Sequence, residues 1–190
     1  MKLHFNLIAP FYDKFIGLNT TTDWRTLLEI KQPGLLLDAG AGTGRVSKII
    51  QRLHPEMKII LADESAGMLK EAMKSISFSA VICQTENLPF KEEVFSRIVM
   101  VDALHHVKNH SGTINELWRV LTTGGMTVIE EPDIDKVPVK LLAVAEKVLL
   151  MRSKFLSSKA IKKLLPNSAI IDVVFSNINF WLCFKKNHSV

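Results

Sequence analysis

Apolar runs and segments of helical spacing alternate along most of the chain. The runs are short and β-like, which is the pattern of buried strands between loops and helices. They predict strands at about Leu35–Ala39, Lys58–Asp63, Ala80–Gln84, Arg97–Asp102, Met126–Glu130, Ile170–Phe175 and Asn179–Phe184. The pattern therefore indicates an α/β fold.

Helical patterns lie between the first five runs, at Arg45–Leu53, Ala66–Ser75 and Gly112–Leu121. Strands that alternate with helices form a mostly parallel sheet covered on both faces. The last two runs are joined tightly around Ser176 and Asn177, which leaves no room for a crossover helix. That final pair must therefore be antiparallel.

Three glycines, Gly40, Gly42 and Gly44, follow the first predicted strand, and a helix is expected from about Thr43. They lie at the carboxyl edge of the sheet, where open α/β sheets bind ligands. A glycine there permits positive φ and lets a ligand approach the backbone. A phosphate-binding P-loop is excluded because no Gly-Lys-Ser/Thr follows, and the dinucleotide fingerprint fits imperfectly because the third glycine comes one residue early.

The composition fits one domain with a sizeable core: 190 residues, of which 47% are hydrophobic and 23% charged. Cys83 and Cys183 lie far apart in apolar runs and match neither a disulfide framework nor a metal motif. The N-terminal segment lacks the features of a secretory signal, and no run approaches the roughly 20 apolar residues of a membrane span. We therefore expect a cytoplasmic protein, and the oligomeric state stays open.

The net charge of +5 is concentrated in the C-terminal part of the chain. Residues 152–190 contain seven Lys or Arg and one Asp, whereas the preceding residues are close to neutral. Such asymmetry can mark an anionic partner, including a nucleic acid. A solvated face around Lys159, Lys162 and Lys163 is the simpler interpretation, so a nucleic-acid partner is not favoured but stays open.

Five segments occur together in a characteristic order: LDAGAGTGRVS, LADESAGML, TENLPF, FSRIVMVDALHHV and ELWRVLTTGGMTVIEEP. In this order and spacing they resemble the class I S-adenosylmethionine-dependent methyltransferases. The segment FNLIAPFYDKF and the later DWR resemble the ubiquinone/menaquinone biosynthesis C-methyltransferases more specifically. The resemblance implies a Rossmann-like three-layer sandwich with a seven-stranded sheet of order 3-2-1-4-5-7-6, mostly parallel with the last strand antiparallel.

The resemblance also implies a single methyltransferase domain over residues 1–190. Within it we expect an N-terminal helical cap at 1–30 and a cofactor-binding core at 35–132. Substrate-side helices are expected at 133–168, including one at about Val137–Phe155, and the terminal antiparallel strand pair at 169–186. The implied cofactor is S-adenosylmethionine.

The cofactor site implied by the resemblance runs along the carboxyl edge of the sheet. Asp63 is placed to accept hydrogen bonds from both ribose hydroxyls, although it can also start the next helix together with a Ser65 cap. Asp38 is expected to be buried, which requires a cation or a set of donors to face it. The expected cofactor-binding residues are Asp38, Gly40, Ala41, Gly42, Gly44, Asp63, Glu64, Met68, Gln84, Thr85, Glu86, Asp102 and Ala103.

His105 and His106 follow the fourth strand and form, with Asp102, the candidate catalytic set. A histidine there can act as a general base, since its ordinary pKa is about 6.5. One of the pair can equally serve packing or loop shape. The expected substrate-binding residues are Tyr12, Phe11, His106 and Glu131.

No metal ligand is expected. Glu130, Glu131, Asp133 and Asp135 cluster after the fifth strand, and oxygen-rich clusters can hold Mg²⁺. An acidic loop with one carboxylate facing the substrate pocket is the preferred interpretation.

The acceptor is expected to be a small molecule of apolar or aromatic character, methylated on carbon or oxygen. The fourth strand is followed by Asp102, Ala103, Leu104 and His105, not by the Asn/Asp-Pro-Pro-aromatic set of the resembling amino methyltransferases. The apolar 137–155 segment and the N-terminal aromatic residues can roof an apolar pocket. Two alternatives stay open: a non-catalytic methyltransferase-fold protein that binds a partner such as RNA, and an NAD-dependent oxidoreductase.

Overall fold

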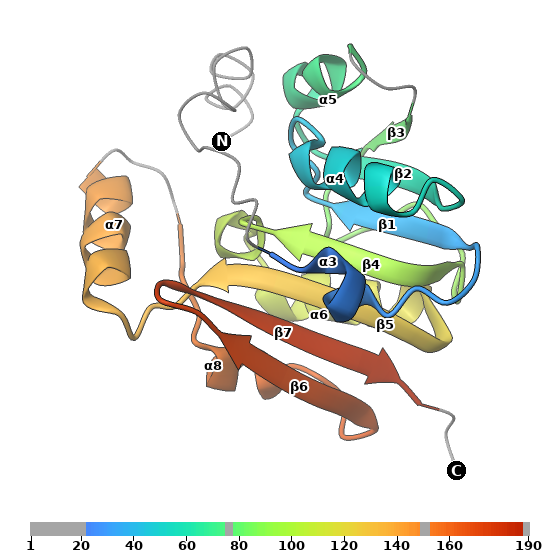
Figure 1. The fold of residues 1–190 in the computed structure, drawn as a ribbon. Helices are drawn as coiled ribbons and strands as arrows, with labels where there is room; N and C mark the ends of the chain where they lie inside the picture. The colour runs from blue at the N-terminus through green and yellow to red at the C-terminus, as the bar shows by residue number, and fades with distance from the viewer. Residues whose placement is uncertain (1–21, 75–77, 149–152, 188–190) are drawn as a thin grey trace.

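The computed structural model describes residues 22–74, 78–148 and 153–187, and its centre is one seven-stranded sheet (Figure 1). The strands lie in the order β3-β2-β1-β4-β5-β7-β6. They span β1 Leu35–Ala39, β2 Lys58–Asp63, β3 Ser79–Ile82, β4 Phe95–Val101, β5 Leu121–Pro132, β6 Ala169–Phe175 and β7 Asn179–Lys186. The predicted fold class and strand order are confirmed.

The first five strands are parallel to one another, and β7 is antiparallel to both of its neighbours. The tight connection at Ser176 is closed by its N–H, which donates to the carbonyl of Asn179 at 2.8 Å. The expected antiparallel pair is therefore confirmed. Strand β5 begins at Leu121, earlier than the predicted Met126, and its pairing with β4 is irregular between Leu121 and Met126, where Gly124 takes a φ of +77°.

Helices cover both faces of the sheet (Figure 1). One face carries α3 Trp24–Leu28, α4 Arg45–Leu53 and α5 Ala66–Ala72, and the other carries α6 His110–Val120 and α8 Ser158–Lys162. The helix α7 Val137–Val148 stands beyond the strand ends, and the short 3₁₀ helix η2 Leu104–His106 follows β4. Among the described residues, no helix has the length and apolar character that crossing a bilayer requires.

Three helix boundaries differ from the predicted ones for identifiable reasons. Helix α4 matches the predicted Arg45–Leu53 segment, but it begins later than the expected start at about Thr43 because Gly44, its N-cap, takes a φ of +70°. Helix α6 begins before the predicted Gly112 because the Asn109 side chain accepts the Gly112 N–H and caps it. Helix α7 covers only the first part of the predicted 137–155 segment, of which residues 149–152 lie outside the described residues.

The inner strands of the sheet are buried on both faces, and successive residues of a strand pack into opposite layers. In β1, Leu37 packs with the α6 side, whereas Leu36 packs with α3 and α4. Strand β7 alternates in the same way, since Phe180, Leu182 and Phe184 face one core and Trp181 and Cys183 the other. This two-sided burial explains why the strands read as continuous apolar runs.

The β6–β7 hairpin offers a matched test of this burial. Phe180 is fully buried, whereas its cross-strand partner Phe175 is 55% exposed. We expect Phe180→Ala to lower the free energy of unfolding by about 3–5 kcal/mol, through lost burial and the cavity left behind. Phe175→Ala should change it by about 1 kcal/mol or less. Urea unfolding followed by circular dichroism measures both, and equal losses would contradict the described orientation of the hairpin.

Candidate functional site

The glycine loop after β1 is shaped by close approach to the loop that follows β4. Gly40 has a φ of +75°, and a Cβ built on it would lie only 2.6 Å from the Cβ of Ala103. Gly42 has a φ of +52°, but a Cβ there would meet no atom of the described residues within 4 Å. Gly40 is therefore needed for packing, whereas Gly42 keeps open the space in front of the loop.

The loop is tied to the end of β2. The N–H groups of Gly40 and Ala41 both donate to the carbonyl of Ala62, at 2.7 and 3.1 Å. The N–H of Gly42 donates to Asp63 Oδ2 at 2.8 Å. The backbone is thereby fixed at three successive residues.

Asp63 serves the loop and the following helix at once. Its Oδ1 accepts the Ser65 N–H at 2.7 Å, and the Ser65 hydroxyl caps α5 by accepting the Met68 N–H. Burial raises the pKa of Asp63, while the hydrogen bonds from Ser65 and Gly42 lower it. The predicted Ser65 cap is confirmed, and the carboxylate also borders the cavity described below.

Asp38 lies at the end of β1 and is only 2% exposed. Its Oδ2 accepts a hydrogen bond from the Ser47 hydroxyl of α4 at 2.7 Å. Burial raises its pKa to about 6, opposed by the Ser47 hydrogen bond and the nearby charge of Arg45. The expected burial and donor are both present, although Asp38 is not among the residues that line the cavity.

Asp102 directly follows β4 and takes a left-handed conformation with a φ of +50°. Its carboxylate is held by the guanidinium of Arg45, the first residue of α4. Burial raises the pKa of Asp102 and the Arg45 charge opposes that shift. Arg45 was not predicted as a site residue, and its position directly after the glycines was the available signal.

Glu131, predicted to bind substrate, has both carboxylate oxygens engaged within the described part of the chain. It is only 2% exposed and is not among the cavity-lining residues. Its Oε1 accepts the N–H groups of Ala103 and Leu104 at 3.0 and 2.8 Å, and its Oε2 lies 2.6 Å from His105 Nδ1. Because both oxygens contact the turn after β4, Glu131 positions this turn, and its contact with a substrate stays a prediction.

The two histidines separate into different environments. His105 is 5% exposed, and its ring stacks on Phe155 with centroids 4.4 Å apart. His106 lines the cavity, and its Nδ1 lies 3.1 Å from the Ser153 hydroxyl. Burial, together with the neighbouring His105, lowers the pKa of His106 to about 3. His106 is thus neutral near pH 7, whereas the carboxylate of Glu131 raises the pKa of His105 against the effect of burial.

A cavity of about 370 Å³ lies in front of the glycine loop, within the size range of small-molecule sites. The structure gathers most of the predicted site residues around it: Gly40, Ala41, Gly42, Asp63, Glu64, Met68, Gln84, Thr85, Glu86, Asp102, Ala103 and His106. Residues that were not predicted complete the wall: Thr43, Arg45, Cys83, Met100, Val101, Val107 and Lys108. Gly44 and His105 are not among the lining residues, and Phe11 and Tyr12 lie outside the described residues.

The acidic segment at the C-terminal end of β5 uses its carboxylates within the chain. Glu130 accepts a hydrogen bond from the Asn179 amide at 2.9 Å, and Asp133 accepts the Asp135 N–H at 3.1 Å. Since Glu131 holds the turn after β4, three of the four acids have protein donors. These carboxylates support loops and strands.

The basic residues near the C-terminus also divide into two groups. Lys185 pairs with Glu29 at 2.8 Å and Lys186 with Glu93 at 3.0 Å, so this pair helps to hold β7 in place. Lys159, Lys162 and Lys163 are exposed on and after α8. Together with the exposed Lys154, this second group is a candidate anion-binding surface.

Residues 37–129 match the family described as methyltransferase domain. The chain is 29% identical over 134 residues to a ubiquinone/menaquinone biosynthesis C-methyltransferase of Desulfotalea psychrophila, covering 65% of this chain and 54% of that protein. It is 31% identical over 109 residues to a human protein named probable tRNA methyltransferase 9B, covering 55% of this chain and 23% of that protein. The chain thus spans about half or less of these relatives' length.

A solved structure of a SAM-dependent methyltransferase from Thermotoga maritima has the same fold, with a TM-score of 0.72 at 17% identity. The superposition covers 98% of this chain and all of that one. Together with the family match, this confirms the predicted resemblance to class I methyltransferases.

The buried Asp38 predicts a distinct pH dependence of stability. Its pKa is about 6 in the folded chain, against about 3.9 for an unperturbed aspartate. Between these values the folded state binds more protons, so this group's contribution to the free energy of unfolding falls as pH rises. At about 1.4 kcal/mol for each pKa unit, the fall is on the order of 2–3 kcal/mol.

Asp38→Asn should remove this contribution. The wild-type free energy of unfolding minus that of the variant should decrease between pH 4 and pH 7 in urea titrations. Ser47→Ala removes the hydroxyl that stabilises the carboxylate, so it should move the midpoint of the decrease to higher pH. A difference that stays flat with pH is the result that would refute the raised pKa.

Proposed function

The chain carries a methyltransferase domain, and we propose that it transfers a methyl group from S-adenosylmethionine to a small apolar or aromatic acceptor, on carbon or oxygen. The observation that carries the proposal is the cavity at the carboxyl edge of β1, β2 and β4. Its wall combines a glycine backbone without side chains, the Asp63 carboxylate and an apolar floor. The residues present therefore fit a nucleoside with a charged tail.

Each part of the wall fits one part of that cofactor. Gly42 leaves open space beside the loop, which admits a ligand against the backbone. Asp63 already accepts two N–H groups, and a carboxylate has about four acceptor positions, so it can also accept ribose hydroxyls. Gln84 and Thr85, after β3, offer amide and hydroxyl groups to the base.

The charges around the cavity favour a cation near the end of β4. S-adenosylmethionine supplies its methyl group from a positively charged sulfur. Asp63, Glu86 and Asp102 border the cavity, and of these Asp102 is neutralised in part by Arg45. Arg45 itself borders the cavity and has five N–H donors, which suits a ligand carboxylate.

The acceptor side of the proposal is supported by apolar surface. Met68, Met100, Val101 and Val107 contribute to the cavity wall. Helix α7 adds exposed apolar side chains, with Val137 at 68% and Leu141 at 67% exposed. A hydrophobic acceptor can be held between such surfaces and aligned with the methyl donor, and alignment alone contributes several kcal/mol to catalysis.

His106 is proposed as a residue that shapes and orients the acceptor pocket. A general base works best with a pKa near the working pH, whereas the pKa of His106 is lowered to about 3. Cys83 is also unsuited to attack, because burial raises its thiol pKa to about 11. Catalysis by alignment of the acceptor with the methyl donor is therefore favoured over acid–base catalysis by His106 or covalent catalysis by Cys83.

An RNA acceptor is the second candidate, favoured by the relative named for tRNA methylation and by the three exposed lysines at α8. Binding to phosphates would weaken steeply with salt. Methyl transfer from labelled cofactor to total tRNA, compared with transfer to a set of quinones and phenols, distinguishes the two acceptor classes. Transfer to tRNA alone would replace the small-molecule proposal.

Cofactor binding can be tested with two matched glycines. Gly42 and Gly124 both have positive φ, and a Cβ on either meets no atom within 4 Å, but only Gly42 borders the cavity. We expect Gly42→Ala to weaken S-adenosylmethionine binding at least about tenfold, since the added methyl group occupies ligand space. Gly124→Ala bears a similar backbone strain and should bind as the wild type does. Calorimetry measures both, with NADH as the control ligand.

Absence of S-adenosylmethionine binding to the folded wild type would overturn the proposed function. NADH binding in its place would favour the oxidoreductase alternative. Equal weakening in both glycine variants would show that strain, and not occupied space, causes the loss.

His106→Ala should lower turnover much more than cofactor affinity, because His106 lies on the wall that also carries Val107 and Ala103. We expect a drop in turnover of about tenfold or more with the S-adenosylmethionine dissociation constant within about twofold. Steady-state rates with a responsive acceptor and calorimetry give the two values. Unchanged turnover would remove His106 from the acceptor site.

A further inference from the structure

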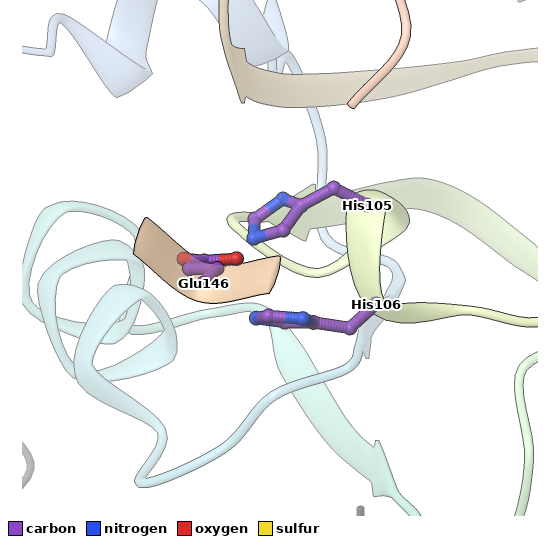
Figure 2. A group of neighbouring side chains, drawn as sticks. All are labelled: His105, His106 and Glu146. Atoms are coloured by element: carbon purple, nitrogen blue, oxygen red, sulfur yellow. The ribbon is translucent and has the colours of Figure 1, made fainter. Parts of the chain in front are cut away.

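His105, His106 and Glu146 meet where α7 approaches the turn after β4. Each residue has one nitrogen or oxygen ligand atom, and these atoms all lie within 4.8 Å of one another. Figure 2 shows the two imidazole rings one above the other, with the Glu146 carboxylate facing their outer edges. The residues come from segments about 40 positions apart, so the fold brings them together.

Each imidazole ring is oriented by a polar contact at its Nδ1 atom. His105 Nδ1 lies 2.6 Å from Glu131, and His106 Nδ1 lies 3.1 Å from the Ser153 hydroxyl. Metal-binding histidines almost always have their second nitrogen held in this way, by a carboxylate, a carbonyl or another polar group. An N–H at Nδ1 places the lone pair of each ring on Nε2, on the side of Glu146.

The carboxylate of Glu146 lacks a hydrogen-bond donor for one of its oxygens within the described part of the chain. That oxygen, Oε2, is buried. A buried anionic oxygen without a donor costs several kcal/mol unless a positive charge compensates it. His105, its neighbour, is already engaged by a second carboxylate, that of Glu131.

We propose that His105, His106 and Glu146 bind a divalent transition metal ion of the zinc class. Two imidazoles and one carboxylate are a donor set that Zn²⁺ and Fe²⁺ accept, and a site with three protein ligands keeps one position open. His106 borders the cavity, so the open position adjoins the acceptor space.

Binding a metal ion requires the three ligand atoms to move closer together than they are in the structure. Zinc bonds to nitrogen and oxygen are about 2.0–2.2 Å long, which places tetrahedral ligands about 3.4 Å apart. The turn that carries the histidines is held by Glu131. The adjustment is therefore expected in the Glu146 side chain, whose Oε2 has no hydrogen-bond partner among the described residues.

The use of this ion in catalysis rests on the proposed function. The open position can take the oxygen of a phenol or hydroxyl acceptor, and a metal ion lowers the pKa of such a group. The acceptor proton then passes to water, and an oxygen lone pair forms the new bond to the methyl carbon. The carbon–sulfur bond breaks at the same time, and its electron pair stays on sulfur as a neutral sulfide.

Metal binding can be measured without any turnover. The full chain, treated with EDTA and dialysed, is titrated with Zn²⁺ by calorimetry, and with Co²⁺ while visible absorption is recorded. We expect one site with the strong visible bands of four-coordinate Co²⁺. Glu146→Gln should weaken Zn²⁺ binding at least about tenfold, and Glu71→Gln, on the remote helix α5, should leave it unchanged.

Thermal unfolding by circular dichroism supplies an independent readout. Zn²⁺ should raise the melting temperature of the wild type and of Glu71→Gln, but not that of Glu146→Gln. Zn²⁺ affinity and stabilisation unchanged by both Glu146→Gln and His106→Gln would overturn the site, as would absence of binding to the wild type.

The same samples separate the two proposals. S-adenosylmethionine binding without Zn²⁺ binding overturns the metal site and leaves the proposed function in place. Zn²⁺ binding that depends on Glu146, without cofactor binding, supports the site and overturns its catalytic use.

Discussion

The carboxylate of Glu131 holds the turn on which the cavity depends. It accepts two successive backbone N–H groups and contacts His105, while being almost fully buried. Charge-assisted hydrogen bonds of this kind are roughly twice as strong as neutral ones, and leaving their donors unpaired would be costly. Loss of Glu131 would release the turn after β4 and, with it, one wall of the cavity.

That turn and the glycine loop fix each other by direct contact. Ala103 occupies the space that a side chain on Gly40 would need. The close approach of the two loops therefore requires a glycine on one side and a small residue on the other. The next residue back along the chain, Asp102, is held by Arg45 at the start of α4. Two loops that are distant in sequence therefore form one rigid edge, which is the preorganisation that alignment of a donor and an acceptor requires.

The sequence allowed most of the fold to be predicted, because its signals are local. Each strand is an apolar run, and the glycines, the Ser65 cap and the tight Ser176 turn mark where elements change. The roles of Glu131 and Arg45 could not be predicted, because they depend on contacts 27 and 57 positions away along the chain. Glu131 faces the turn after β4 only because of the register between β4 and β5.

The pair His105 and His106 shows that residue type alone does not determine the chemistry of a site. The two residues are identical and adjacent, yet the pKa of His105 is raised by Glu131 and that of His106 is lowered by burial. Sequence pattern predicts that both lie near the cavity but gives no means of telling them apart. Their pKa values differ because Glu131 on β5 contacts only His105, whereas burial dominates at His106. A general-base role therefore cannot be assigned to an ALHH motif from its sequence alone. With Glu131 and Glu146 beside it, the pair offers nitrogen donors next to carboxylate oxygens, which is a donor set that suits a metal cation.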